Sequence, residues 1–228
     1  MRGTVLLGFT TLLALLGLGV GAWSHAPPPE PRLVLVPMGE VDAALVDALG
    51  HALRVRTSGV VRVEEHRPLP AYAWDARTRR YSAEALLRAL DEDPPWAAWK
   101  SAIVTDAELF SERGRLAPRA VIGSGAVRGP SCVVSVAHVQ ARSSSSESLV
   151  RRLTDVLLHE VGHTVGLHHC GVPGCVMAPA HGDPVVWTDL RRHDFCPLCR
   201  LKAGDDLFPA PGFPPLAVHA AGWAVSGR

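Results

Sequence analysis

Hydrophobic positions repeat with two different periods along the first half of the chain, which predicts strands interleaved with helices. The segment 32–38, with the apolar residues Leu33, Val34, Leu35 and Val36, is typical of a buried strand, and 60–64 alternates like a strand. Helical spacing of apolar residues follows at 41–53 and again from Ser82, with Glu84 in the first turn. Further strands are expected at 102–105, 119–124 and 132–139. Strands that alternate with helices indicate an α/β fold.

A longer helix is predicted to begin in the serine run at 144–146. Ser144 and Glu147 have the spacing of a capping box, in which a hydroxyl and a carboxylate satisfy free backbone donors. A plain flexible loop is the alternative interpretation of this run. Apolar residues then fall at helical spacing and define a face turned to the core: Leu149, Leu153, Val156, Leu157 and Val161.

Residues 1–22 have the features of an export signal. Arg2 is positive, Thr4 to Trp23 is an uncharged run of 20 residues, and Val20-Gly21-Ala22 offers small side chains to a signal peptidase. We expect cleavage, because so glycine-rich a run makes a poor spanning helix. Membrane anchoring through residues 4–23 is the alternative, since 20 apolar residues can span a bilayer. Both interpretations are extracytoplasmic, with a secreted or periplasmic protein expected after cleavage.

The remaining chain divides into a linker, one domain and a tail. A proline-rich linker covers 23–31, the domain covers 32–203, and a proline-rich tail of unknown role covers 204–228. A chain of 228 residues can bury the core of one such domain. Its formal net charge of +1 lacks the basic excess of nucleic-acid-binding proteins, so no nucleic-acid partner is expected. Nothing in the composition indicates an oligomeric state.

Three histidines predict a catalytic metal site. His159 and His163 lie one helical turn apart, so both imidazoles can reach one ion. Glu160 can reach a water at an open coordination position without itself binding the metal. Gly166 can end the helix in a left-handed conformation and return the chain so that His169 becomes the third ligand. Three nitrogen ligands and one open position are typical of catalytic zinc; exposed histidines or a purely structural metal are the alternatives.

Four cysteines predict a second metal site. Four residues separate Cys170 from Cys175, and two separate Cys196 from Cys199. Two short-spaced pairs joined by a longer loop can supply a tetrahedral four-thiolate zinc site. Two disulfides are the alternative in an exported protein, but a Cys-x-x-Cys disulfide closes a small ring and stabilises little. We therefore expect zinc here. The fifth cysteine, Cys132, lies in a strand-like run and is expected to be a small buried apolar residue.

The combined pattern resembles the archaemetzincin family of zinc metallopeptidases, of the metzincin clan. It reads His159-Glu160-x-x-His163-x-x-Gly166-x-x-His169-Cys170, then Cys175-Val176-Met177, then Cys196-Pro197-Leu198-Cys199. The similarity extends over 33–202. It implies a single compact metzincin-like α/β domain with a mixed sheet, an active-site helix and a zinc cleft. It also implies that Met177 forms a Met-turn beneath the histidines and that the four cysteines hold a structural zinc.

The chain departs from the family pattern in two respects. Eighteen residues separate Met177 from Cys196, one more than the family pattern leads us to expect, so that loop is expected to be reshaped. An export signal is also unusual for a family expected inside cells. The nearby His181, Arg191 and His193 are candidates for substrate contacts or simply solvated residues.

These features together predict a zinc-dependent peptidase with two zinc ions per chain, one catalytic and one structural. A zinc-activated water is the expected nucleophile, and Glu160 is the expected general base and acid. The expected partner is a peptide or protein substrate. The alternative is a catalytically silent zinc-binding module that recognises a peptide or protein partner, but such a module does not need Glu160.

Overall fold

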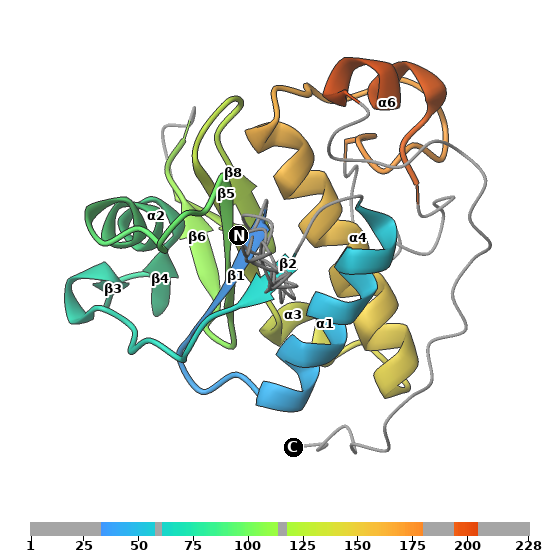
Figure 1. The fold of residues 1–228 in the computed structure, drawn as a ribbon. Helices are drawn as coiled ribbons and strands as arrows, with labels where there is room; N and C mark the ends of the chain where they lie inside the picture. Colours follow the sequence, from blue (N-terminus) through green and yellow to red (C-terminus); the bar gives the residue numbers. More distant parts are fainter. Residues whose placement is uncertain (1–32, 58–60, 114–117, 180–193, 205–228) are drawn as a thin grey trace, which may run out of the picture.

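A five-stranded sheet in the order β2-β1-β5-β9-β8 lies at the centre of the fold (Figure 1). The structure is a computed structural model that describes residues 33–57, 61–113, 118–179 and 194–204. Four strands are parallel: β1 (Leu33–Met38), β2 (Val61–Val63), β5 (Lys100–Thr105) and β9 (Ser131–Ser135). The edge strand β8 (Gly123–Gly125) is antiparallel to β9. The mixed α/β sheet agrees with the fold class expected from the sequence.

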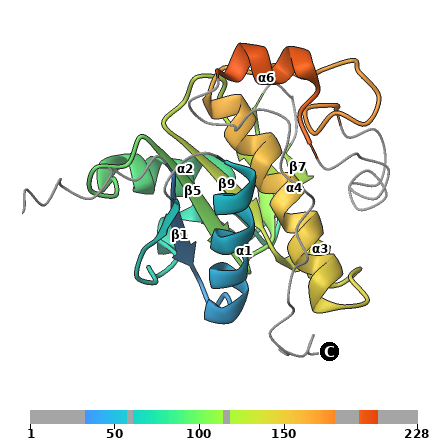
Figure 2. The same ribbon diagram turned by 45° about the vertical axis from the view of Figure 1, so that its right-hand side comes forward.

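Alternate residues of the parallel strands pack on opposite faces of this sheet. Leu33 and Leu35 of β1 join the core beneath α1 (Ala43–Arg56) and α4 (Ser146–Thr164). Val34 and Val36 join the core beneath α2 (Ala83–Glu92). Figures 1 and 2 show α1 and α4 side by side on one face and α2 on the other. Because both faces are covered, the strands need no polar side, which explains their continuous apolar sequences.

A second, four-stranded sheet flanks α2 in the order β3-β4-β6-β7. Its strands are short: β3 (Trp74–Asp75), β4 (Arg80–Ser82), β6 (Leu109–Ser111) and β7 (Arg119–Val121), with the 3-10 helix η1 (Ala71–Ala73) before them. Only Ile122 separates β7 from β8. The predicted strand at 119–124 is therefore two strands, one in each sheet. Because they are joined through Ile122, an edge of the second sheet lies next to an edge of the first.

One expected strand is wrong in its second half. β9 ends at Ser135, and residues 137–140 form the short helix α3 (Ala137–Gln140). Val136 and Val139 are both buried and three residues apart, whereas His138 between them is exposed. That spacing belongs to a helix rather than a strand. The small residues Ser135 and Ala137 fit either period, so the sequence around them does not distinguish a strand from a helix.

The chain ends are not part of the described structure. The expected export segment 1–22, the linker 23–31 and the tail from 205 lie outside the described residues. Within the described ranges, no helix combines the length and apolar character needed to cross a bilayer. The last described helix, α6 (Pro197–Ala203), lies near the C-terminal end of α4 (Figure 2).

Candidate active site

Helix α4 begins in the predicted serine run, but with different capping residues. Ser145 is the N-cap, its hydroxyl accepts from the Ser148 N–H at 3.2 Å, and the Ser148 hydroxyl accepts from the Ser145 N–H at 3.2 Å. The expected box of Ser144 and Glu147 is therefore shifted by one residue, and a serine replaces the carboxylate. Glu147 remains in the first turn, where its negative charge favours the helix N-terminus. The five apolar residues predicted to face the core are all buried.

A tight turn ends α4 directly after the second histidine. The Leu167 N–H donates to the Gly162 carbonyl oxygen at 2.9 Å, and the Gly166 N–H donates to the His163 carbonyl oxygen at 2.9 Å. These two bonds define a Schellman motif, whose left-handed residue is Gly166 with φ of +100°. A side chain is unfavourable at that φ, so glycine sets the end of the helix. The turn sends the chain back towards the histidines, as the sequence predicted.

The two helix histidines face each other through their Nε2 atoms. The Nδ1 atoms of His159 and His163 each lie 2.8 Å from a backbone carbonyl oxygen, that of Val176 and that of Leu167 respectively. A carbonyl oxygen only accepts, so each Nδ1 carries the proton and each Nε2 is the unprotonated nitrogen that can bind a metal. The two Nε2 atoms are 3.2 Å apart. Nitrogens about 2.0–2.1 Å from one tetrahedral zinc lie about 3.3–3.4 Å apart, so the pair fits such an ion.

His169 completes the cluster. One ligand atom from each of His159, His163 and His169 lies within 4.8 Å of the others. The ring centroid of His169 is 5.3 Å from that of His159 and 5.0 Å from that of His163. Burial lowers the pKa of His163, which keeps that ring neutral at pH 7 as metal ligation requires. His169 is exposed, so the cluster opens to solvent on one side.

Glu160 is buried beside this cluster, between α4 and the edge strand β8. Burial raises the pKa of Glu160 to about 8, while the Arg113 guanidinium and a hydrogen bond from the Gly125 N–H act in the opposite direction. A divalent cation at the neighbouring histidines would also favour the charged carboxylate. The carboxyl group lines the same cleft as His159 and His169.

The cleft has a volume of about 530 Å³, a size that accommodates part of a peptide chain. His159, Glu160 and His169 line it. Polar residues outside the histidine cluster also line it: Arg80 and Glu108, which form an ion pair at 3.1 Å, and Arg119 of β7. Further lining comes from β7, β8, β9 and the short helix α3: Val121, Ile122, Gly123, Ser135 and His138.

Several lining residues carried no signal in the sequence. Arg80, Arg119 and His138 come from three separate segments, and only the pairing of the second sheet brings the two arginines to the cleft. The polar candidates named from the sequence, His181, Arg191 and His193, lie outside the described residues. The same is true of most of the loop between Met177 and Cys196.

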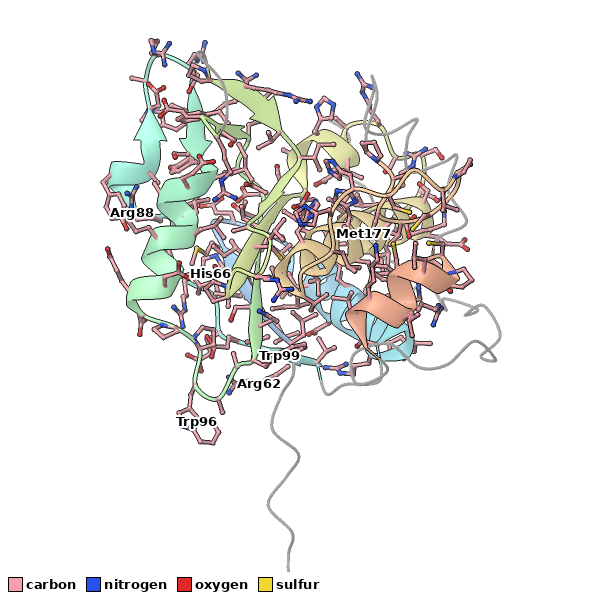
Figure 3. All side chains as sticks on the ribbon, turned by 90° about the horizontal axis from the view of Figure 1, so that it is seen from above. Arg62, His66, Arg88, Trp96, Trp99 and Met177 are labelled. Carbon is pink, nitrogen blue, oxygen red and sulfur yellow. The ribbon has the colours of Figure 1, made fainter. Side chains whose placement is uncertain are left out.

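Met177 packs directly against the histidine-bearing helix. It is fully buried, and its sulfur occupies the space that a side chain on Gly162 would need. Its backbone carbonyl accepts from the Cys170 N–H at 2.8 Å. Figure 3 shows Met177 on the α4 side of the central sheet, opposite Arg88 of α2. The geometry therefore places Met177 next to Gly162, the residue that precedes His163; the Met-turn role that the sequence resemblance implies stays a prediction.

The four clustered cysteines meet at one point beside this loop. One sulfur from each of Cys170, Cys175, Cys196 and Cys199 lies within 4.8 Å of the others, and no cysteine of the chain is disulfide-bonded in the structure. The Cys170 and Cys196 sulfurs are 3.8 Å apart. Sulfurs about 2.3 Å from one tetrahedral zinc lie about 3.8 Å apart, whereas bonded sulfurs lie at about 2.0 Å. The arrangement fits a four-thiolate zinc site, and the remaining Cys132 is a buried core residue as expected.

Backbone donors also point at these sulfurs. The Cys196 N–H donates to the Cys175 sulfur at 3.3 Å, and the Val172 N–H donates to the Cys170 sulfur at 3.4 Å. Such bonds stabilise sulfur in its thiolate form. Cys175 also lies in an isolated bridge with Asp194, which joins the first cysteine loop to the segment that carries the second pair.

Comparisons with known proteins agree with this geometry. The sequence profile described as "Peptidase family M54" matches residues 103–203. The archaemetzincin of Haloarcula marismortui is 29% identical over 174 residues, which cover 73% of this chain and 95% of that protein. The archaemetzincin of Natronomonas pharaonis is 26% identical over the same shares.

Two solved structures share the fold. The archaemetzincin of Archaeoglobus fulgidus, complexed with malonate, superposes with a TM-score of 0.64 at 25% identity and covers 75% of this chain and 99% of its own. That of Methanopyrus kandleri gives 0.63 at 26% identity and covers 76% of this chain and 94% of its own.

Proposed function

Since this chain belongs to the archaemetzincin family, peptidase family M54, and is a zinc metallopeptidase, we propose that it cleaves peptide bonds at the three-histidine centre with Glu160 as general base and acid. The observation that carries the proposal is the pair of Nε2 lone pairs held 3.2 Å apart beside a buried carboxyl group. His159, His163 and His169 are the residues that would hold zinc. Zinc bound there would lower the pKa of a bound water and would polarise the substrate carbonyl.

The role proposed for Glu160 is proton transfer between water and the leaving amine. As base its carboxylate accepts a proton from the attacking water, and as acid it passes that proton to the nitrogen of the broken peptide bond. Strand β8 restricts the carboxyl group in two ways, because the Gly125 N–H donates to it and Gly123 lies against its side chain. A carboxyl group held in this way needs little reorganisation before the proton moves.

We propose that the substrate binds as an extended peptide along β8. This strand is the last of the five-stranded sheet, and in the described part of the chain no strand pairs with its outer side. Ile122 and Gly123 line the cleft at that edge, next to the histidine cluster. An extended peptide can add to an exposed edge through backbone hydrogen bonds, which makes binding tolerant of substrate sequence. The polar residues that line the cleft, Arg119 among them, would contact substrate side chains.

We propose two zinc ions per chain, with the second held by Cys170, Cys175, Cys196 and Cys199. Four thiolates leave no open position, so this ion would be structural. It would tie the loop after α4 to α6. We further propose that residues 1–22 export the protein and are removed, which places the domain 32–203 outside the cytoplasm; anchoring through 4–23 is the alternative outcome.

Replacement of Glu160 by Ala tests the mechanism. The three histidines stay in place, so zinc content should be unchanged while hydrolysis of a cleavable peptide falls by about two to four orders of magnitude. His163→Ala should instead lose both the metal and the activity, because two histidines bind zinc weakly. Glu147→Ala is the matched control, since Glu147 is exposed in the first turn of the same helix.

Two outcomes contradict the proposal. If Glu160→Ala cleaves as fast as the parent, Glu160 is not the base. If a peptide library yields no cleavage by fully metallated parent protein, a silent zinc-binding module that recognises a peptide or protein becomes the better explanation.

A further inference from the structure

The edge strand β8 has the sequence Gly-Ser-Gly, and both glycines face the catalytic helix. Side chains alternate along a strand, so positions 123 and 125 share one face while Ser124 points the other way. On that shared face lies Glu160 of α4, with which both glycines make close contacts. Glycine weakens a strand because it has no side chain to pack, so two of them in three residues need a reason.

Gly123 lies against the side chain of Glu160. A Cβ at this position would lie 2.8 Å from both the Cγ and the Oε1 of Glu160, and 3.0 Å from its Cδ. These three atoms are the nearest neighbours of that Cβ, and all belong to the glutamate side chain. Any residue larger than glycine would therefore push the carboxyl group away from β8.

Gly125 holds the same residue from a second direction. Its backbone N–H donates a hydrogen bond to the Glu160 carboxyl group. A Cβ here would lie 2.9 Å from the Glu160 carbonyl oxygen and 3.3 Å from Oε2. The backbone of β8 thus approaches Glu160 closely both at its side chain and at its backbone carbonyl oxygen.

Backbone conformation does not explain these glycines. The described glycines with positive φ are Gly39, Gly166, Gly174 and Gly204, and neither residue of β8 is among them. Any amino acid could adopt the local backbone, so what positions 123 and 125 require is the absence of a side chain.

We propose that Gly123 and Gly125 are positioning residues that form a backbone cradle for the Glu160 carboxyl group, a proposal that rests on the proposed function of Glu160. Gly123 leaves the space into which the carboxyl group fits, and the Gly125 N–H fixes its orientation. A glutamate side chain has three rotatable bonds, and the cradle restricts it to the arrangement that faces the cleft. The same strand would then orient both the catalytic base and the bound peptide.

The test is Gly123→Ala in the full chain, with Gly171→Ala as matched control. A Cβ on Gly171 meets nothing within 4 Å, and its φ is not positive, so the control adds the same methyl group without a contact. The clash at position 123 falls on a movable side chain rather than on backbone, so the variant should fold. We expect zinc content, melting temperature and KM to match the parent, and kcat to fall by about 10- to 100-fold, as a displacement of about 1 Å can cause.

A second measurement does not depend on catalysis. Amide hydrogen exchange of Gly125, followed by NMR, should accelerate about tenfold or more in Gly123→Ala and in Glu160→Ala, because both remove the carboxylate that accepts from this N–H. Exchange in the other strands of the sheet should not change. Gly171→Ala should leave both exchange and kcat at parent values.

Replacement of Glu160 by the shorter Asp distinguishes a clash between position 123 and the carboxyl group from a general effect of Gly123→Ala on β8. In a Glu160→Asp background the carboxyl group is one methylene shorter, so Gly123→Ala should change kcat by less than about twofold. Parent-like kcat and Gly125 exchange in Gly123→Ala would overturn the proposal, and so would a loss of zinc or of melting temperature that accounts for the lower rate. If the parent cleaves no peptide, the proposed function fails, while the exchange of Gly125 still decides whether the cradle exists.

Discussion

The packing of Met177 against Gly162 gives a prediction whose size follows from the structure. A Cβ on Gly162 would collide with the Met177 sulfur and would lie 3.2 Å from its Cε and 3.2 Å from Phe195 Cε1. Met177 is fully buried and Phe195 is 5% exposed, so neither side chain can move into solvent. Gly162→Ala therefore inserts a methyl group into a filled space directly beside His163.

Two effects of opposite sign set the magnitude. Overpacking of a filled core costs about 1–3 kcal/mol, and alanine in a helix interior is favoured over glycine by about 1 kcal/mol. We expect Gly162→Ala to lower the free energy of unfolding by about 1 kcal/mol. Met177→Ala alone should cost about 2–5 kcal/mol, because it opens a cavity. In the double variant the clash is absent and the new methyl group refills part of the cavity, so its cost should be about 2 kcal/mol below the sum.

The measurement is urea unfolding of the parent, both single variants and the double variant at one fixed free zinc concentration. Zinc is held constant because an ion that binds only the folded state adds to apparent stability. Gly171→Ala is the control and should stay within about 0.5 kcal/mol of the parent. Additive effects of the two substitutions, within about 0.5 kcal/mol, would refute the packing argument, since the two sites would not share a space.

Three further predictions concern metal, export and a buried ion pair. Elemental analysis should find two zinc ions per chain, one of them labile to a chelator; one ion or none, with no free thiols after denaturation, would favour disulfides instead. Sequencing of the mature amino terminus should start just after Ala22, whereas full-length protein in the cytosol would contradict export and full-length protein in the membrane would favour the anchor. Asp155 is fully buried and lies 3.6 Å from the Arg56 guanidinium. Asp155→Asn should therefore lower the free energy of unfolding, measured in urea, by about 1–3 kcal/mol, whereas Asp47→Asn at an exposed position of α1 should lower it by about 0.5 kcal/mol or less. Equal losses in both variants would contradict this.

The parts of the fold that sequence predicts are those set by local chemistry. The left-handed Gly166 and the spacing of His159 and His163 are short-range features, so the helix end and the paired imidazoles follow from a few residues. The capping box was wrong by one residue because Ser144, Ser145 and Ser146 are chemically equivalent as caps, and only the three-dimensional fold selects among them. Such degeneracy limits any argument from propensity alone.

The parts that sequence does not predict depend on pairing between distant segments. Arg119 reaches the cleft because β7 pairs with β6, and nothing near position 119 in the chain indicates that partner. The contact between Gly123 and Glu160 joins residues far apart in sequence, and glycine in a strand usually suggests only a bulge or a turn. A cleft is formed where two sheets and a helix meet, so its residues become evident only when the register of both sheets is known.

The two metal clusters share one short segment, and this determines how they depend on each other. His169 of the first cluster directly precedes Cys170 of the second, and the Cys170 N–H donates to the carbonyl of Met177 at 2.8 Å. No side chain of residues 168–174 is buried, so hydrophobic packing alone gives this loop little rigidity. Zinc at the four thiolates would fix both ends of this loop, and with them the third histidine and the methionine beneath the helix. Loss of the cysteine site should therefore weaken zinc binding at the histidines, whereas loss of the exposed His169 should leave the cysteine site intact, because that site is closed by its own four ligands.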